Sequence, residues 1–417
     1  RYVVKAGERD VLYRNDGNGH FEDVTLSAGI DGLHPGLSAT WWDHDRDGQP
    51  DLYVCNDFWD ADRLYHNQGD GTFVDIAAEA LPHTPWFAMG ADYADVDLDG
   101  HMDLLAADMA ATTHYRSKVM MGDMNESRWF LESAEPRQYM RNALYLGTGT
   151  GRFLEGAFLS GVASTDWTWS VLFGDLDADG RPDLFATNGT ANHSFDPDLG
   201  ARTRDAMAEL AAAGVTDPKV AWERQWSLYR EVPPIAEPNV ALRNRGPLDF
   251  EHAGESWGLD LVSVSFGAAL SDLDRDGDID VVVSNVGQPV ALFAGEAGGH
   301  ALVVELEGRA SNRDGLGATV TVEAGGRTQT AQLFTTHGYM SSGEPALHFG
   351  LGELAEVEAI SVDWPSGHTQ RFTAVAADQR LLITEPAGAP PVVEDSVRPA
   401  RFSDRNWEAG LRAAASP

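Results

Sequence analysis

The sequence predicts an all-β protein, in which a β-propeller with helical inserts is followed by a small antiparallel β-sandwich-like domain. Three observations support this fold class. A short acidic loop occurs four times in the first 296 residues, each time between two strand-like segments. A hairpin signature with central Asn and Gly residues also recurs in this region. From about residue 297 the chain changes to longer segments in which apolar and polar residues alternate.

The acidic loops share the pattern D-x-D-x-D-G-x-x-D, and they begin at Asp43, Asp95, Asp175 and Asp272. Four carboxylates within nine residues repel one another unless a hard cation with oxygen ligands compensates them. The EF-hand calcium loop opens in the same way but closes with Glu at position 12, so this shorter loop suits a connection between strands. A solvated acidic turn explains a single copy, whereas four copies in one register favour Ca²⁺.

We therefore predict about four bound Ca²⁺ ions, one in each loop, with carboxylate ligands at positions 1, 3, 5 and 9 and a backbone carbonyl at position 7. Glycine at position 6 permits the sharp turn. The predicted carboxylate ligands are Asp43, Asp45, Asp47, Asp51, Asp95, Asp97, Asp99, Asp103, Asp175, Asp177, Asp179, Asp183, Asp272, Asp274, Asp276 and Asp280. The residues that offer backbone carbonyls are Gln49, His101, Arg181 and Asp278.

Four short strands per unit, repeated about every 40–50 residues, are typical of propeller blades. The hairpin signature begins at Leu12, Leu64, Leu144 and Val240, and its Asn and Gly residues supply the positive φ of tight turns. Residues 1–25 carry a hairpin without a preceding loop, so we expect four full units and one partial blade. The number of blades stays open. The aromatic residue after each turn is expected to pack between sheets; these are Phe21, Phe73, Phe153 and Phe250.

Two inserts, near residues 108–140 and 190–238, lengthen the spacing between the loops. The second insert contains a helical pattern that ends at Gly214 and a second pattern around WERQWSLYREV. Long inserts between repeated elements often carry function, although helices that merely pack onto the ring are an alternative. The second insert groups large apolar residues that are typical interface anchors for a protein or glycan partner. These residues are Trp222, Trp226, Leu228 and Tyr229.

The chain divides into a propeller over 1–296, a β domain over 297–385, and a Pro-rich tether with a short C-terminal helix over 386–417. Its net charge of −35 argues against nucleic acid and anionic membranes as partners. No apolar stretch reaches the roughly 18 residues of a transmembrane helix. The chain starts at Arg1, as expected of a processed or truncated sequence. Cys55 is the only cysteine, so no intramolecular disulfide forms, and we expect it to be a buried strand residue.

The sequence contains no H-E-x-x-H, no G-x-S-x-G and no P-loop, so it predicts no catalytic or cofactor-binding residues. Ser341 and Ser342 near His337 could form a nucleophile–base pair, but a turn explains that segment better. Asp166, Trp167 and Trp169 precede the third loop. These aromatic rings either stack on a sugar at the propeller face or wedge between blades.

The acidic repeats resemble FG-GAP/VCBS repeats, the calcium-loop blades of integrin-type propellers. The segments SNRDGLGATVTVEAGG, HGYMSSGEPALHFGLG and VDWPSGHTQRF resemble the ASPIC/UnbV domain. The order of the two parts resembles that of bacterial relatives of cartilage acidic protein 1. The resemblance implies a secreted, periplasmic or cell-surface calcium-binding protein without implying a single activity.

We therefore expect a binding or scaffold protein with a protein or glycan partner. One alternative is a structural subunit of a larger envelope assembly. Another is a biosynthesis-associated, UnbV-like enzyme with a site at the mouth of the propeller. The weak affinity of simple aspartate loops, roughly 10⁻⁴–10⁻³ M in extracellular modules, favours a location outside the cytoplasm.

Overall fold

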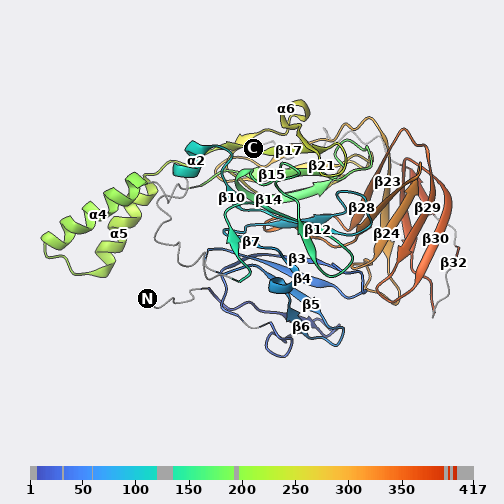
Figure 1. Cartoon of the computed structure of the whole chain (residues 1–417), viewed down its shortest axis with the longest axis horizontal. Coiled ribbons are helices and arrows are strands. Elements are labelled where there is room, and N and C mark those ends of the chain that lie inside the picture. Colours follow the sequence, from blue (N-terminus) through green and yellow to red (C-terminus); the bar gives the residue numbers. More distant parts are fainter. Residues whose placement is uncertain are drawn as a thin grey trace.

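The computed structural model describes residues 7–30, 32–58, 60–119, 135–191, 197–388, 393–394 and 398–401. It is mostly β (Figure 1). The propeller blades, coloured blue to yellow, lie beside an orange and red sandwich of two sheets. A helical hairpin projects from the side of the blades that is remote from the sandwich.

Each blade is an antiparallel meander, and the acidic loop joins its first and second strands. The first blade comprises β3 (Gly36–Trp42), β4 (Asp51–Asn56), β5 (Arg63–Asn67) and β6 (Phe73–Asp75). The second comprises β8 (Ala91–Ala94), β9 (Asp103–Ala106), β12 (Ala143–Gly147) and β13 (Phe153–Glu155). The third comprises β14 (Asp166–Gly174), β15 (Asp183–Asn188), β17 (Val240–Asn244) and β18 (Phe250–His252), with β10 (Met109–Ala110) paired to its edge. The fourth comprises β20 (Ser265–Ser271), β21 (Asp280–Asn285) and β22 (Ala291–Phe293).

The partial blade is the hairpin of β1 (Tyr13–Asn15) and β2 (Phe21–Asp23). Leu12, next to it, packs against the apolar side chains of the first blade. The expectation that the aromatic residue after each turn packs between sheets is correct for Phe153 and wrong for Phe21, which is 63% exposed. All six residues of β1 and β2 are exposed, so among the described residues nothing packs over this sheet.

The inner strands β3, β8, β14 and β20 follow one another along an arc, each in contact with the next. Hydrogen bonds of polar side chains tie neighbouring blades together across this arc. Thr40 Oγ1 on β3 donates to the Ala91 carbonyl on β8 at 3.1 Å. The backbone N–H of Phe173 on β14 donates to Asp92 Oδ2 on β8 at 2.7 Å. The first strands of the blades therefore line the propeller axis.

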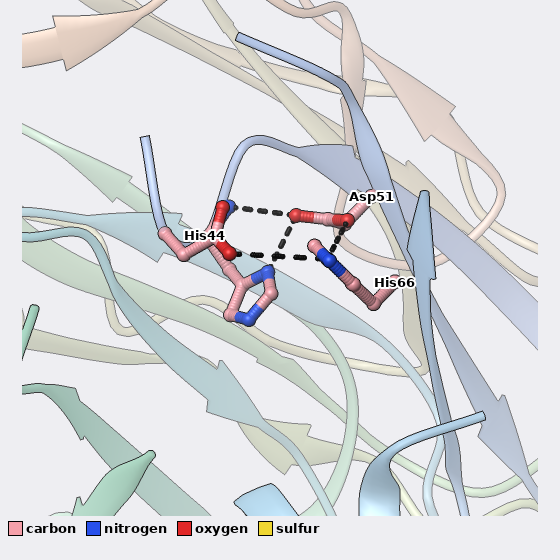
Figure 2. A group of neighbouring side chains, drawn as sticks. His44, Asp51 and His66 are labelled. Atoms are coloured by element: carbon pink, nitrogen blue, oxygen red, sulfur yellow. Dashed lines mark hydrogen bonds and ion pairs between the residues drawn. The ribbon is translucent and has the colours of Figure 1, made fainter. Parts of the chain in front are cut away.

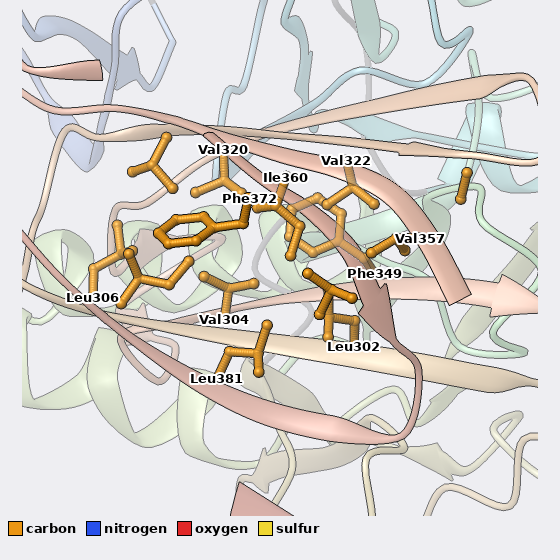
Figure 3. Packing of buried hydrophobic residues seen from close by; sticks show 14 of the residues in the cluster. Leu302, Val304, Leu306, Val320, Val322, Phe349, Val357, Ile360, Phe372 and Leu381 are labelled. Atoms are coloured by element: carbon orange, nitrogen blue, oxygen red, sulfur yellow. The ribbon is translucent and has the colours of Figure 1, made fainter. Parts of the chain in front are cut away.

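The sandwich packs two sheets face to face around one apolar core (Figure 3). One sheet has the order β28 (Ala346–Gly352), β23 (His300–Glu307), β31 (Gln379–Thr384), β33 (Arg398–Arg401). The other has the order β25 (Arg327–Gln332), β24 (Thr319–Ala324), β29 (Glu356–Asp363), β30 (Thr369–Ala376), β32 (Val393–Glu394). Alternate residues such as Val320 and Val322 point into the core, as the period of two predicts. The sandwich is not wholly antiparallel, because β23 runs parallel to β31, and β30 parallel to β32.

A hairpin of the sandwich reaches into the propeller axis. It consists of β26 (Thr336–His337) and β27 (Ser341–Ser342). The Gly338 N–H donates to the Ala91 carbonyl on β8 at 2.9 Å, and the Tyr339 N–H donates to Ser170 Oγ on β14 at 3.0 Å. We call this hairpin, residues 334–343, the plug. Because it touches several inner strands at once, it fixes the sandwich to the blades.

We expect Gly90→Ala to destabilise the protein by roughly 1–3 kcal/mol, the usual cost of overpacking. A Cβ at residue 90 would lie 2.6 Å from the Trp169 carbonyl oxygen and 2.8 Å from the carbonyl carbon of Gly338 in the plug. Both neighbours are backbone atoms, so neither can swing aside. Urea denaturation measures the loss. The matched control is Gly298→Ala, where a Cβ meets nothing within 4 Å; equal midpoints for the two variants would contradict the close packing at the plug.

The two helices expected in the second insert are present. They are α4 (Pro197–Ala212) and α5 (Pro218–Arg230). Gly214 lies just beyond α4 with φ of 70°, and Asp217 caps α5 by accepting the Lys219 N–H at 2.9 Å. The helices pack mainly on each other through Leu199, Ala206, Leu228 and Val232. Trp222 and Trp226 remain 56% and 39% exposed, so in this structure they do not pack onto the ring.

The remaining short elements lie in the loops between blades or in the two inserts, which separate the second and third strands of the second and third blades. They are α1 (Ala77–Ala80), β7 (Thr84–Pro85), α2 (His114–Val119), β11 (Gln138–Tyr139), β16 (Glu237–Pro238), α6 (Gly254–Trp257) and β19 (Val262–Ser263). The predicted C-terminal helix lies outside the described residues.

Candidate metal centres

The acidic loops fold back on their own first carboxylate. In the first loop, Asp43 accepts the N–H groups of Asp47 at 3.1 Å and Gly48 at 2.8 Å. Corresponding bonds recur in the other three loops. The glycine at position 6 has a positive φ of 85–100° in every loop, as the predicted sharp turn requires. The repeated sequence pattern thus produces one repeated backbone conformation.

This conformation brings carboxylates together. In the first, second and fourth loops the acids at positions 1, 3 and 5 each place an oxygen within 4.8 Å of the others. In the third loop the converging acids are Asp175, Asp177 and Asp183. Asp177 Oδ1 and Asp179 Oδ1 are buried there without a hydrogen-bond partner among the described residues. An all-oxygen set with unsatisfied buried lone pairs fits a hard cation.

The pKa values show the electrostatic cost of this arrangement. Burial, reinforced by the neighbouring aspartates, raises the pKa of Asp43 to about 6 and that of Asp95 to about 7. The same causes raise the pKa of Asp103, Asp175 and Asp183 to about 8. Carboxylates held so close are poorly compensated by the protein alone. A divalent cation among them would remove the repulsion and restore the charged form.

The aspartate at position 9 has a structural function that the sequence analysis missed. Asp103 accepts the Val96 N–H at position 2 of its loop at 2.9 Å and the Gly147 N–H on the third strand of the blade at 2.8 Å. The position-9 aspartates of the other loops do the same. This carboxylate therefore ties the loop to the rest of its blade. Ligation by the position-7 carbonyls of Gln49, His101, Arg181 and Asp278 stays a prediction.

Residues of the sandwich form hydrogen bonds or an ion pair with three of the four loops. The Gln332 side chain accepts the Asp43 N–H at 2.9 Å and donates to the Asp43 carbonyl at 2.8 Å. At the third loop, the Gly352 N–H donates to the Ala178 carbonyl at 2.8 Å. At the fourth, Arg380 pairs with Asp272 at 2.7 Å. The acidic loops are thus the base on which the sandwich docks, and nothing local in the sequence indicates this.

Comparison with known protein families finds a match for both parts of the chain. The family described as ASPIC and UnbV matches residues 308–390, and the FG-GAP-like repeat matches residues 43–106 and 133–186. The chain carries FG-GAP-like repeats and an ASPIC and UnbV domain. Three of the four acidic loops, which begin at Asp43, Asp95 and Asp175, lie within the FG-GAP-like match, and most of the sandwich lies within the ASPIC and UnbV match.

The relatives are distant. The chain is 23% identical to cartilage acidic protein 1 of Homo sapiens over 353 residues, which are 83% of this chain and 43% of that protein. It is 22% identical to the Mus musculus protein of the same name, over 83% of this chain and 44% of that protein. The chain therefore spans less than half the length of these relatives. An exotype rhamnogalacturonan lyase, YesX, aligns over 78% of this chain and 57% of its own, but with a TM-score of 0.27 and 12% identity it supports no inference.

The acidic loops differ in the side chains that surround them. In the third loop, Arg243 Nε lies 2.6 Å from Asp177 Oδ2. In the first, His44 Nδ1 lies 2.5 Å from Asp51 Oδ2. Burial lowers the pKa of His44, but the hydrogen bond and charge of Asp51 outweigh it, so that pKa is raised overall. The four loops therefore share one backbone conformation but differ in the charged side chains beside them.

The other sequence-derived candidates are structural. Trp167 is buried among aromatic and methionine side chains, and Trp169 Nε1 donates to the Gly189 carbonyl at 2.6 Å, so the wedge interpretation is right and the exposed sugar platform is wrong. Asp166 accepts the Thr112 N–H. His337 and Ser341 do not pair with each other: His337 Nδ1 lies 2.6 Å from Asp92, and Ser341 Oγ donates to the Tyr339 carbonyl.

Cys55 is buried in β4, and burial raises the pKa of its thiol, as expected of a core residue. Among the described residues no helix is long and apolar enough to span a bilayer.

Proposed function

We propose that this protein is a calcium-binding β-propeller that acts outside the cytoplasm as a binding or scaffold protein. The observation that carries the proposal is the convergence of three carboxylates, one of them on a buried residue, in each of four loops of one backbone conformation. Ca²⁺ would compensate the negative charge that remains in these loops. Its ligands would be the carboxylates of the converging groups, together with the position-7 carbonyls.

Calcium in this position would also order the junction between the domains. Asp43 and Asp272, the first residues of two loops, each contact a side chain of the ASPIC and UnbV domain. An ion that fixes these loops would therefore fix the surface on which Gln332 and Arg380 dock. The scaffold would behave as one rigid unit when calcium is bound and as two loosely joined domains when it is removed.

A location outside the cytoplasm agrees with this chemistry. Simple aspartate loops of extracellular modules bind calcium at roughly 10⁻⁴–10⁻³ M, concentrations that a resting cytosol does not reach. FG-GAP-like repeats and the similarity to cartilage acidic protein 1 support the same location. The net charge of −35 favours solubility and leaves a basic surface as a suitable partner.

The helical hairpin α4–α5 is the proposed docking element for a protein or glycan partner. The Trp222 and Trp226 rings lie 5.7 Å apart, and the Tyr229 ring lies 5.3 Å from that of Trp226. Exposed aromatic side chains of this kind are typical anchors of interfaces. The hairpin has its own small core, so it presents these rings without help from the blades.

Deletion of residues 200–230 should abolish co-purification of a partner or an oligomer while calcium binding and the far-UV signal of the blades remain. The finer test is the double substitution Trp222→Ser, Trp226→Ser, which should lose the partner with little change in melting temperature. Tyr115→Ser, at another exposed aromatic residue, is the matched control. If the deletion unfolds the protein, or if the double variant keeps its partner, the hairpin is not the docking element.

A further inference from the structure

Two histidines, His44 in the first acidic loop and His66 on β5, converge on one carboxylate (Figure 2). His44 Nδ1 lies 2.5 Å from Asp51 Oδ2, and His66 Nδ1 lies 3.1 Å from Asp51 Oδ1. His66 Nδ1 also lies 3.9 Å from Asp45 Oδ2. One ligand atom from each of these four residues lies within 4.8 Å of the others. The group therefore joins two ring nitrogens to two carboxylates.

The other repeats lack this pair of histidines. Position 2 of the loop, which is His44 in the first repeat, is Val96, Leu176 and Leu273 in the others. His66 lies on β5, the third strand of the first blade, directly before Asn67, whose N–H donates to the position-9 aspartate Asp51. Its counterparts are Leu146, Arg243 and Ala294. The shared loop conformation needs neither imidazole, so the two histidines call for a separate explanation.

The chemistry of the group differs from that of the oxygen-only loops. Ca²⁺ takes oxygen ligands, whereas imidazole nitrogens combined with carboxylates suit Zn²⁺, Co²⁺, Ni²⁺ and Cu²⁺. His44 and Asp51 are buried, which preorganises half of the ligand set. His66 and Asp45 are about a quarter exposed, which leaves a path for an ion from solvent.

We propose that the first repeat contains a second cation position, for a divalent transition metal such as Zn²⁺, formed by His44, His66, Asp51 and Asp45. It shares only Asp45 with the converging group of Asp43, Asp45 and Asp47. The proposal does not rest on calcium occupancy of the other loops, whose ligands it does not use. Binding requires a free lone pair on each Nδ1 atom: a protonated ring releases its Nδ1 proton to solvent, and a neutral ring carries its proton on Nε2 instead.

The test uses the full chain with Cu²⁺ as a spectroscopic probe, in excess calcium so that the oxygen-only positions are filled. Electron paramagnetic resonance of one equivalent of Cu²⁺ should show coupling to two nitrogen ligands in the unmodified protein. His66→Leu, which installs the residue of the second repeat, should leave one coupled nitrogen and weaken binding at least about tenfold. Zn²⁺ should displace the copper signal.

Asp47→Asn is the matched control, because Asp47 belongs only to the oxygen-only group; it should keep the two-nitrogen spectrum. Circular dichroism of each variant confirms folding. A copper spectrum without nitrogen coupling in the unmodified protein overturns the proposal without needing any variant. The same conclusion follows if His66→Leu keeps the two-nitrogen spectrum, or if Asp47→Asn abolishes it. None of these outcomes affects the calcium proposal, which is measured separately by calcium stoichiometry.

Discussion

Chelation of calcium with EDTA should lower the melting temperature of the whole chain. Without the ion, each loop holds carboxylates whose burial and mutual repulsion raise their pKa values, which is a cost of the folded state. At free calcium about 100 times Kd, each independent site adds roughly 2.7 kcal/mol of stability. Four such sites together approach the total stability of a typical domain, about 5–15 kcal/mol.

Calorimetry in EDTA and after calcium is restored measures this effect. Magnesium is the control ion: it demands near-octahedral geometry and keeps its waters, so it should restore less stability than calcium at the same concentration. The loss should be largest at the junction between the domains, since three loops contact the sandwich. A melting curve that is unchanged in EDTA would show that calcium in these loops does not stabilise the fold.

Arg380→Met should cost roughly 3–5 kcal/mol, the range for breaking a buried ion pair by removing one partner. Arg380 is 7% exposed, and its guanidinium lies 2.7 Å from Asp272, 2.8 Å from Glu305 and 3.3 Å from Glu344. The substitution keeps most of the volume but leaves the buried Asp272 without this cation. It should also loosen the sandwich from the fourth loop.

The matched control is Arg313→Met, which removes an arginine paired with Asp314 on the surface of the same domain. Exposed pairs contribute little, so its urea midpoint should stay close to that of the unmodified protein. Both variants are compared in EDTA, so that no calcium ion compensates the charge of Asp272. If the two midpoints shift equally, the contact between Arg380 and the fourth loop does not hold the domains together.

Features set by neighbouring residues were predictable from the sequence. The turn at each loop glycine, the four hairpins and the helix that ends before Gly214 all depend on local backbone preferences. The buried position of Cys55 also followed from its strand-like surroundings. Phe21 is exposed although the hairpin pattern predicted that it is buried. Burial of this residue requires another layer to pack over its sheet, and the local sequence does not show whether one is present.

Contacts between distant segments were not predictable. Gln332 binds the backbone of Asp43 across 289 positions, and no spacing or motif marks such a pair. The plug looked like a simple turn, because its glycine and serines fit one equally well. The two bonds of Asp51 to backbone N–H groups were missed because the repeat pattern indicates only that an acid is required. His44 and His66 were visible in the sequence, but only the fold brings His66 to Asp51.

Equilibrium dialysis of the full chain against about 10 mM free calcium, about ten times the weak end of the range for extracellular modules, tests the central claim most directly. Metal analysis should find about four calcium ions per chain, as one ion per loop requires. Asp95→Asn combined with Asp97→Asn should remove one ion and leave the other loops loaded. A chain that retains no calcium at this concentration would contradict the account, as would a stoichiometry that the double substitution leaves unchanged.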